Sequence, residues 1–113
     1  MRFFTLFIVF LFVSCSKDEM KIGDTANIDC TDTISFQNEI YPLIQNSCFS
    51  CHEDGSIAPK ISDYGNISSN ASTILSSFSG EGIQKMPPPP NEAVNDSLIK
   101  KFSCWIEQGK LNN

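Results

Sequence analysis

The chain has 113 residues, which fits one domain with a small core, and its composition is close to that of globular proteins. Its formal charge of −5 leaves no basic face for phosphate backbones, so nucleic acid is excluded as an expected partner. Ten of its apolar residues lie within residues 3–13. The remainder is therefore only modestly hydrophobic. A domain with so few apolar residues usually needs a disulfide, a metal or a cofactor for its stability.

Residues 1–14 have the organisation of a secretory signal: Arg2 precedes an apolar block that is too short to span a membrane. The run Phe12-Val13-Ser14-Cys15 resembles the lipobox of bacterial lipoproteins, which implies that Cys15 is lipidated and becomes the first mature residue. Secretion with a stray cysteine is the alternative. Ser16, at the position after the lipidated cysteine, resembles the signal that sorts lipoproteins to the outer membrane. We therefore expect an extracytoplasmic domain on the periplasmic or the outer face of that membrane, where disulfides are possible.

Residues 15–33 start with the lipidated cysteine and continue as a polar stretch whose apolar residues show neither helical nor strand periodicity. This stretch predicts a tether ahead of a domain at 34–113. Apolar residues then recur at helical spacing and predict a helix at about 35–46, capped by Ser35 and leading to Cys48. Pro42 should bend this helix or shift its start.

Residues 53–60 have the composition of a loop, and residues 62–79 predict one helix at about 68–78. Two glycines and prolines 87–90 then interrupt regular structure. From Asn95 and Asp96 an apolar stripe predicts a helix at about 96–108 that ends at Gly109; its members are Leu98, Ile99, Phe102, Trp105 and Ile106. No strand-like alternation persists, so the predicted fold class is all-α.

The run Cys48-Phe49-Ser50-Cys51-His52 is a C-x-x-C-H motif, the pattern of c-type haem attachment. Two thiols three positions apart lie on one side of a helical turn, so both can add to vinyl groups on one porphyrin edge. The next residue, His52, then brings an imidazole under the iron. His52 is the only histidine of the chain, so it has no rival as a ligand.

Three other interpretations compete with haem attachment. A thioredoxin-like C-x-x-C opens a helix in a βαβ unit, and no such unit is indicated here. A structural zinc site needs four ligands, which would have to combine Cys30 and Cys104 with two residues of the motif. A disulfide between Cys48 and Cys51 leaves His52 without a role.

A second axial ligand is expected from Met86, because Met1 lies in the signal and Met20 in the tether. Met86 lies 34 residues beyond His52 and directly precedes four prolines, which stiffen the loop around a weak thioether ligand. The alternative is an ordinary methionine in a Pro-rich loop.

Together, the C-x-x-C-H motif, the step Met86-Pro87 and the helix with Trp105-Ile106-Glu107-Gln108-Gly109 resemble a bacterial class I-type cytochrome c domain over residues 34–112. The resemblance implies a small cytochrome c-type fold, in which N- and C-terminal helices cross beside one covalent haem c. It also implies that a proline carbonyl, for which Pro59 is the candidate, accepts the Nδ1–H bond of His52.

Cys30 and Cys104 remain outside this motif. At about 100° per residue, Cys104 lies about 160° from the apolar stripe, on the outer face of the last helix. An outward cysteine in an exported protein suggests a Cys30–Cys104 disulfide that joins the tether to this helix; two free thiols are the alternative.

The predicted function is one-electron transfer by a monomer, without catalysis or a small-molecule substrate, since both axial positions are filled by His52 and Met86. Contacts with redox partner proteins should be small and transient. Two alternatives stay open. If Met86 does not bind iron, the domain is a gas sensor or a weak peroxidase. Independently of Met86, the domain could instead be a haem subunit fixed within a larger oxidoreductase complex.

Overall fold

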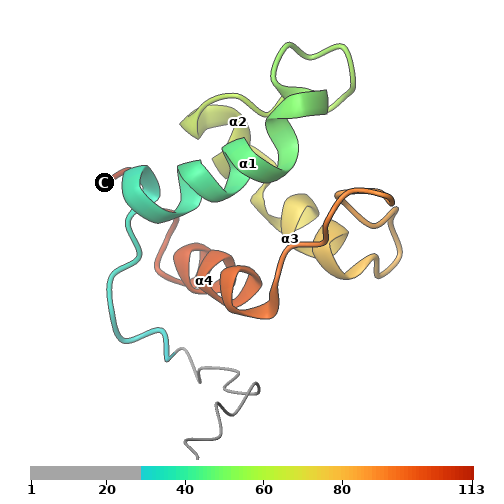
Figure 1. Cartoon of the computed structure of the whole chain (residues 1–113). Coiled ribbons are helices and arrows are strands. Elements are labelled where there is room, and N and C mark those ends of the chain that lie inside the picture. Colours follow the sequence, from blue (N-terminus) through green and yellow to red (C-terminus); the bar gives the residue numbers. More distant parts are fainter. Residues whose placement is uncertain (1–28) are drawn as a thin grey trace, which may run out of the picture.

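The computed structural model describes residues 29–113, which form an all-α domain, as predicted, with no strand in that range (Figure 1). The elements are a short π-helix η1 (Phe36–Ile40), followed by α1 (Tyr41–His52), α2 (Tyr64–Ser69), α3 (Ala71–Ser79) and α4 (Asp96–Glu107). The predicted signal peptide, Cys15 and most of the tether lie outside the described residues.

The first helical segment differs from the predicted helix at 35–46 in its start and in its end. It begins as a π-turn, in which the Tyr41 N–H donates to Phe36 O and the Ile40 N–H to Ser35 O. Pro42 follows in the first turn of α1, directly after the π-turn, at a position where proline is tolerated. Pro42 thus marks a change of helix type, and α1 continues to His52, so that the C-x-x-C-H motif forms its last turns.

Residues 62–79 form two helices where the sequence predicts one. The Asp63 side chain accepts a hydrogen bond from the Asn66 N–H and begins α2, which the sequence prediction missed. At the junction, the Asn70 side chain donates to Asn66 O, and α3 starts directly afterwards. The helix predicted at 68–78 therefore corresponds to α3.

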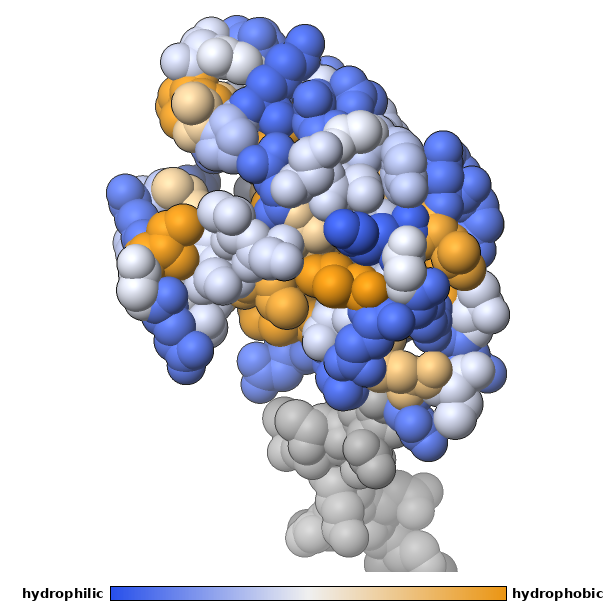
Figure 2. All heavy atoms as spheres, turned by 180° about the vertical axis from the view of Figure 1, so that it is seen from behind, coloured by the Kyte–Doolittle hydropathy of each residue, from blue (hydrophilic) through white to orange (hydrophobic). Residues whose placement is uncertain are grey.

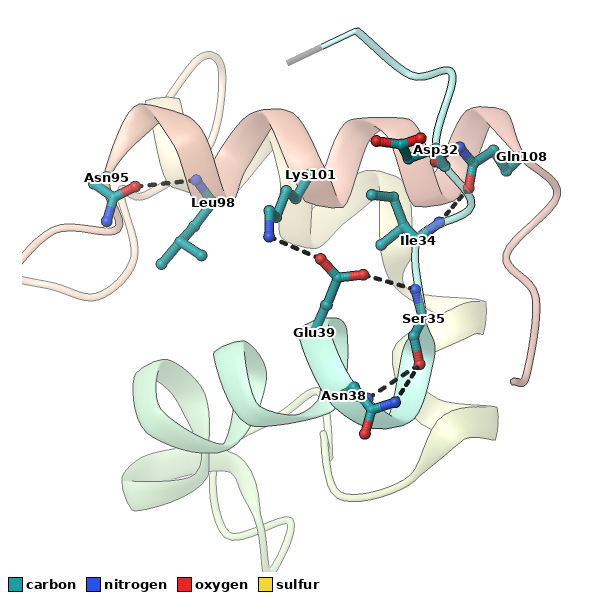
Figure 3. A network of polar contacts seen from close by, with 9 residues as sticks. All are labelled: Asp32, Ile34, Ser35, Asn38, Glu39, Asn95, Leu98, Lys101 and Gln108. Carbon is teal, nitrogen blue, oxygen red and sulfur yellow. Dashed lines mark hydrogen bonds and ion pairs between the residues drawn. The ribbon is translucent and has the colours of Figure 1, made fainter. Parts of the chain in front are cut away.

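The helix predicted at 96–108 is confirmed as α4. The Asn95 side chain accepts from the Leu98 N–H and caps its start (Figure 3). Phe102 and Trp105 are fully buried, whereas the outer members of the stripe are half-buried. Gly109, with φ +90°, follows the end of α4 and permits a left-handed turn.

Residues of every helix contribute to the core, and part of it lies between η1 and α4, where aromatic rings pack together. Phe36 is central to it, with ring centroids 5.6 Å from Trp105 and 5.1 Å from Tyr64. The C-terminus lies beside η1 (Figure 1), where Asn113 Oδ1 accepts from the Phe36 N–H. Segments from both ends of the described chain therefore meet at this interface.

The end of the predicted tether is also packed onto α4. The Gln108 side chain accepts from the Ile34 N–H (Figure 3) and donates to Cys30 O and Asp32 O. A disulfide joins Cys30 to Cys104, with an S–S distance of 2.01 Å. The sequence analysis places Cys104 on the outer face of the last helix, exposed to solvent unless it is bridged. In the structure this segment covers that face, so Cys104 is fully buried.

Candidate functional site

A cavity of about 750 Å³ opens among the end of α1, α3 and the loop that leads into α4. This volume lies within the range of about 300–1,000 Å³ that is usual for ligand and cofactor pockets. In Figure 2 the molecular surface is notched between the loop after α1 and the loop after α3. Much of the wall is apolar, and its apolar residues include Ile57, Ala58, Ile61, Ile74, Ile83, Val94 and Leu98.

All five residues that the sequence associates with a cofactor line this one cavity: Cys48, Cys51, His52, Pro59 and Met86. The first three come from the last turns of α1, and Pro59 comes from the loop that follows. Met86 comes from the far loop, 34 residues beyond His52 in the sequence. The fold thus brings the C-x-x-C-H motif and the methionine to the same space.

The His52 ring is held by two backbone carbonyl groups. Its Nδ1 lies 2.9 Å from Pro59 O and 3.1 Å from Ile57 O, so the expected contact with the Pro59 carbonyl is present. Because carbonyl oxygens only accept, Nδ1 carries the proton, and Nε2 of the neutral ring keeps the free lone pair. This is the tautomer and the fixed orientation that a metal-binding imidazole requires.

A backbone hydrogen bond closes the loop that supplies these carbonyls. The Ile61 N–H donates to His52 O at 2.9 Å, so residues 53–60 leave the end of α1 and return to it. Ile61 is buried, and Ile57 is about half exposed at the edge of the cavity. Sequence reasoning missed Ile57, because the loop composition does not indicate which carbonyl groups turn inward.

The two motif thiols lie on the same part of α1 but differ in their exposure. Cys48 is buried, Cys51 is exposed, and both are free thiols. Burial raises the pKa of the Cys48 thiol to about 11, and the neighbouring Cys51 adds to this effect. Because the reactive form in thiol redox chemistry is the thiolate, this environment argues against a thioredoxin-like dithiol. The motif also ends a helix here, whereas a thioredoxin-like motif begins one.

The alternative zinc site loses two of its four ligands, because Cys30 and Cys104 are bonded to each other. Within residues 29–113, no group of three or more His, Cys, Asp or Glu side chains is arranged to hold a metal ion. The remaining motif residues cannot by themselves complete the closed tetrahedral shell of a structural zinc site.

Met86 is half-buried, and its backbone is fixed to α3. Its N–H donates to Ser77 O at 2.8 Å, across a loop that begins at Gly80. Ser77 itself is buried and also lines the cavity. Sequence reasoning did not select Ser77, because a backbone carbonyl leaves no trace in residue type.

The part of the chain that the structure describes has no helix long and apolar enough to cross a membrane. The chain matches no protein-family model, and no curated protein or solved structure is significantly similar to it.

Proposed function

We propose that the chain is a mono-haem c-type cytochrome that carries single electrons outside the cytoplasm. The observation that carries this proposal is the convergence of Cys48, Cys51, His52 and Met86 on one cavity, with the His52 ring oriented by carbonyl groups. The mostly apolar wall and the volume of about 750 Å³ suit a flat, largely apolar macrocycle.

Each residue has a distinct task in this proposal. The thiols of Cys48 and Cys51 would hold the haem covalently through thioether links. The Pro59 carbonyl would orient His52 so that Nε2 is available to bind the haem iron, and the Met86 sulfur would be the second ligand. The haem iron supplies the one-electron chemistry, and a weak thioether ligand favours its ferrous state. If His52 and Met86 both bind the iron, no position would remain open for a substrate, and we expect no catalysis.

Covalent attachment is tested by intact mass and a pyridine haemochrome spectrum after expression with a haem-maturation system. The wild-type chain should gain the mass of one haem. The variant Cys48→Ser/Cys51→Ser should emerge colourless at its polypeptide mass. A matched control, Cys30→Ser/Cys104→Ser, removes the other two described cysteines and should still carry haem. A colourless wild-type protein from a host proven to mature such proteins would overturn the proposal.

The role of Met86 is tested separately with Met86→Ala. Wild-type ferric protein should show the weak far-red band of methionine sulfur on iron, and its ferrous form should not bind CO without denaturant. The variant should lose the band and bind CO, because the position is then open. CO binding by the wild-type protein would instead support a gas sensor or a weak peroxidase.

We further propose that Cys15 carries a lipid anchor to the outer membrane and that the carrier acts as a monomer with transient partners. Cys15→Ser should move the protein from the detergent phase to the aqueous phase without removing the haem. Gel filtration of detergent-solubilised protein should give the mass of one chain. A larger, stable assembly would instead indicate a subunit of an oxidoreductase complex.

A further inference from the structure

The chain reverses sharply where α3 ends. Gly80 has φ +77°, a left-handed conformation that favours glycine. A Cβ atom at this position would lie 3.0 Å from the Cβ of Lys85 and 3.5 Å from its Cα. The backbone of Lys85 therefore passes directly over Gly80, and residues 81–84 form a loop between these two points.

This close approach places the following residue, Met86, on the end of α3. The last carbonyls of a helix have no partner within the helix. One of them, Ser77 O, accepts the Met86 N–H at 2.8 Å. Because Lys85 immediately precedes Met86, the close crossing at Gly80 brings the Met86 N–H to this carbonyl.

We propose that Gly80 is a positioning residue for Met86: its missing side chain lets Lys85 cross α3, so that Ser77 O fixes the backbone of the methionine at the cavity. This inference rests on the proposed haem ligation and adds a residue that acts through Met86. Gly80 itself does not line the cavity.

The neighbouring Gly82 supplies a matched control. It also has a left-handed φ, +72°, but a Cβ there would meet nothing within 4 Å. Alanine at either position therefore introduces similar backbone strain. Only Gly80→Ala adds a contact with the segment that carries Met86.

The test compares ferric spectra and reduction potentials of haem-loaded wild type, Gly80→Ala and Gly82→Ala. Gly80→Ala should lose the far-red methionine band, lower the potential and bind CO, whereas Gly82→Ala should resemble wild type. All three should retain one covalent haem by mass. An unchanged band in Gly80→Ala, or an equal loss in Gly82→Ala, would overturn the inference.

A rescue variant separates positioning from misfolding. In Gly80→Ala/Lys85→Gly, the Cβ that the new methyl group would meet is gone, so the far-red band should return. Failure of this rescue would count against the inference. In haem-free protein, exchange of the Met86 amide hydrogen should be at least about tenfold faster in Gly80→Ala than in Gly82→Ala. This second measurement tests the contact even if the wild-type chain carries no haem.

Discussion

The two sides of the domain differ in how they are filled. Between η1 and α4, side chains pack directly: Phe36, Phe102 and Trp105 are almost or fully buried, and the Trp105 Nε1–H donates to Leu111 O. The disulfide adds a covalent link on this side. On the other side, the end of α1 and two irregular loops surround a cavity of about 750 Å³.

This difference indicates a division of labour. The packed side can support the helices by its own apolar burial, whereas the cavity side lacks the side-chain volume to close on itself. The residues of the C-x-x-C-H motif and Met86 all belong to the cavity side. We infer that stability and ligand binding are carried by different parts of this small domain.

If the cavity holds haem, as we propose, the strongest test of this comparison is a variant that cannot attach it. The variant Cys48→Ser/Cys51→Ser should lose on the order of 5 kcal/mol relative to the haem-loaded protein, as much as the whole stability of many small domains. Its helices should persist, so that the far-UV circular dichroism is retained, while the open apolar cavity binds a hydrophobic dye. Urea unfolding measures the loss. An equal midpoint in both forms would show that the cavity side closes without a cofactor.

The disulfide tests the packed side. Its removal by Cys30→Ala/Cys104→Ala should cost about 4 kcal/mol, because the bond closes a loop with a sequence separation of 74. If the two sides are independent, the loss should be the same with and without haem, within about 0.5 kcal/mol. Urea unfolding of both forms measures it. A clear dependence on haem would mean that the sides are coupled.

The two sides can be compared by the same substitution, isoleucine to alanine, at one buried position on each side. Ile67 is fully buried away from the cavity, and Ile74 is buried but contributes to the cavity wall. Ile67→Ala should cost about 3 kcal/mol in any form. In haem-free protein, Ile74→Ala should cost less, about 2 kcal/mol, because the small part of its side chain that borders the cavity lacks a packing partner there, and about 3 kcal/mol once haem fills that space. Equal losses in the haem-free form would contradict this view of the cavity.

The same division explains which parts of the fold could be predicted. The helix α4 follows from a local cap, Asn95, and a local apolar stripe, so the sequence contains all that it needs. The helix α2 has six residues and only one buried apolar side chain, Ile67. A single apolar residue cannot show the helical periodicity by which a helix is recognised in a sequence. The π-turn before Pro42 and the burial of Cys104 depend on packing between segments.

The candidate site divides in the same way. The C-x-x-C-H motif could be recognised because its chemistry depends on spacing within one helical turn. Met86 could be selected because the other two methionines lie in the signal and the tether, and because four prolines directly follow it. The carbonyl of Ser77 and the crossing at Gly80 involve the backbone and distant residues, so no residue pattern indicates them.

The smallest effect is expected from the ion pair between η1 and α4. The Lys101 Nζ lies 2.7 Å from Glu39 Oε1, and the Ser35 N–H donates to the other carboxylate oxygen (Figure 3). The bond with Lys101, followed by the Ser35 amide, lowers the pKa of Glu39, although burial opposes this. Since both side chains are partly exposed, we expect Glu39→Gln to cost only about 0.5 kcal/mol near neutral pH.

The sign of the pH dependence follows from that lowered pKa. The folded state binds the Glu39 proton less tightly than the unfolded state, so the contribution is complete above the unfolded carboxyl pKa of about 4.3. It disappears as the pH falls through the lower folded pKa. The difference in unfolding free energy between wild type and Glu39→Gln should therefore vanish in acid and shrink in high salt. The control Glu107→Gln removes the same charge from an exposed glutamate at the C-terminal end of α4, where a negative charge is unfavourable, and it should not lower the unfolding free energy near neutral pH. A difference that persists in acid would mean that Glu39 acts through packing rather than charge.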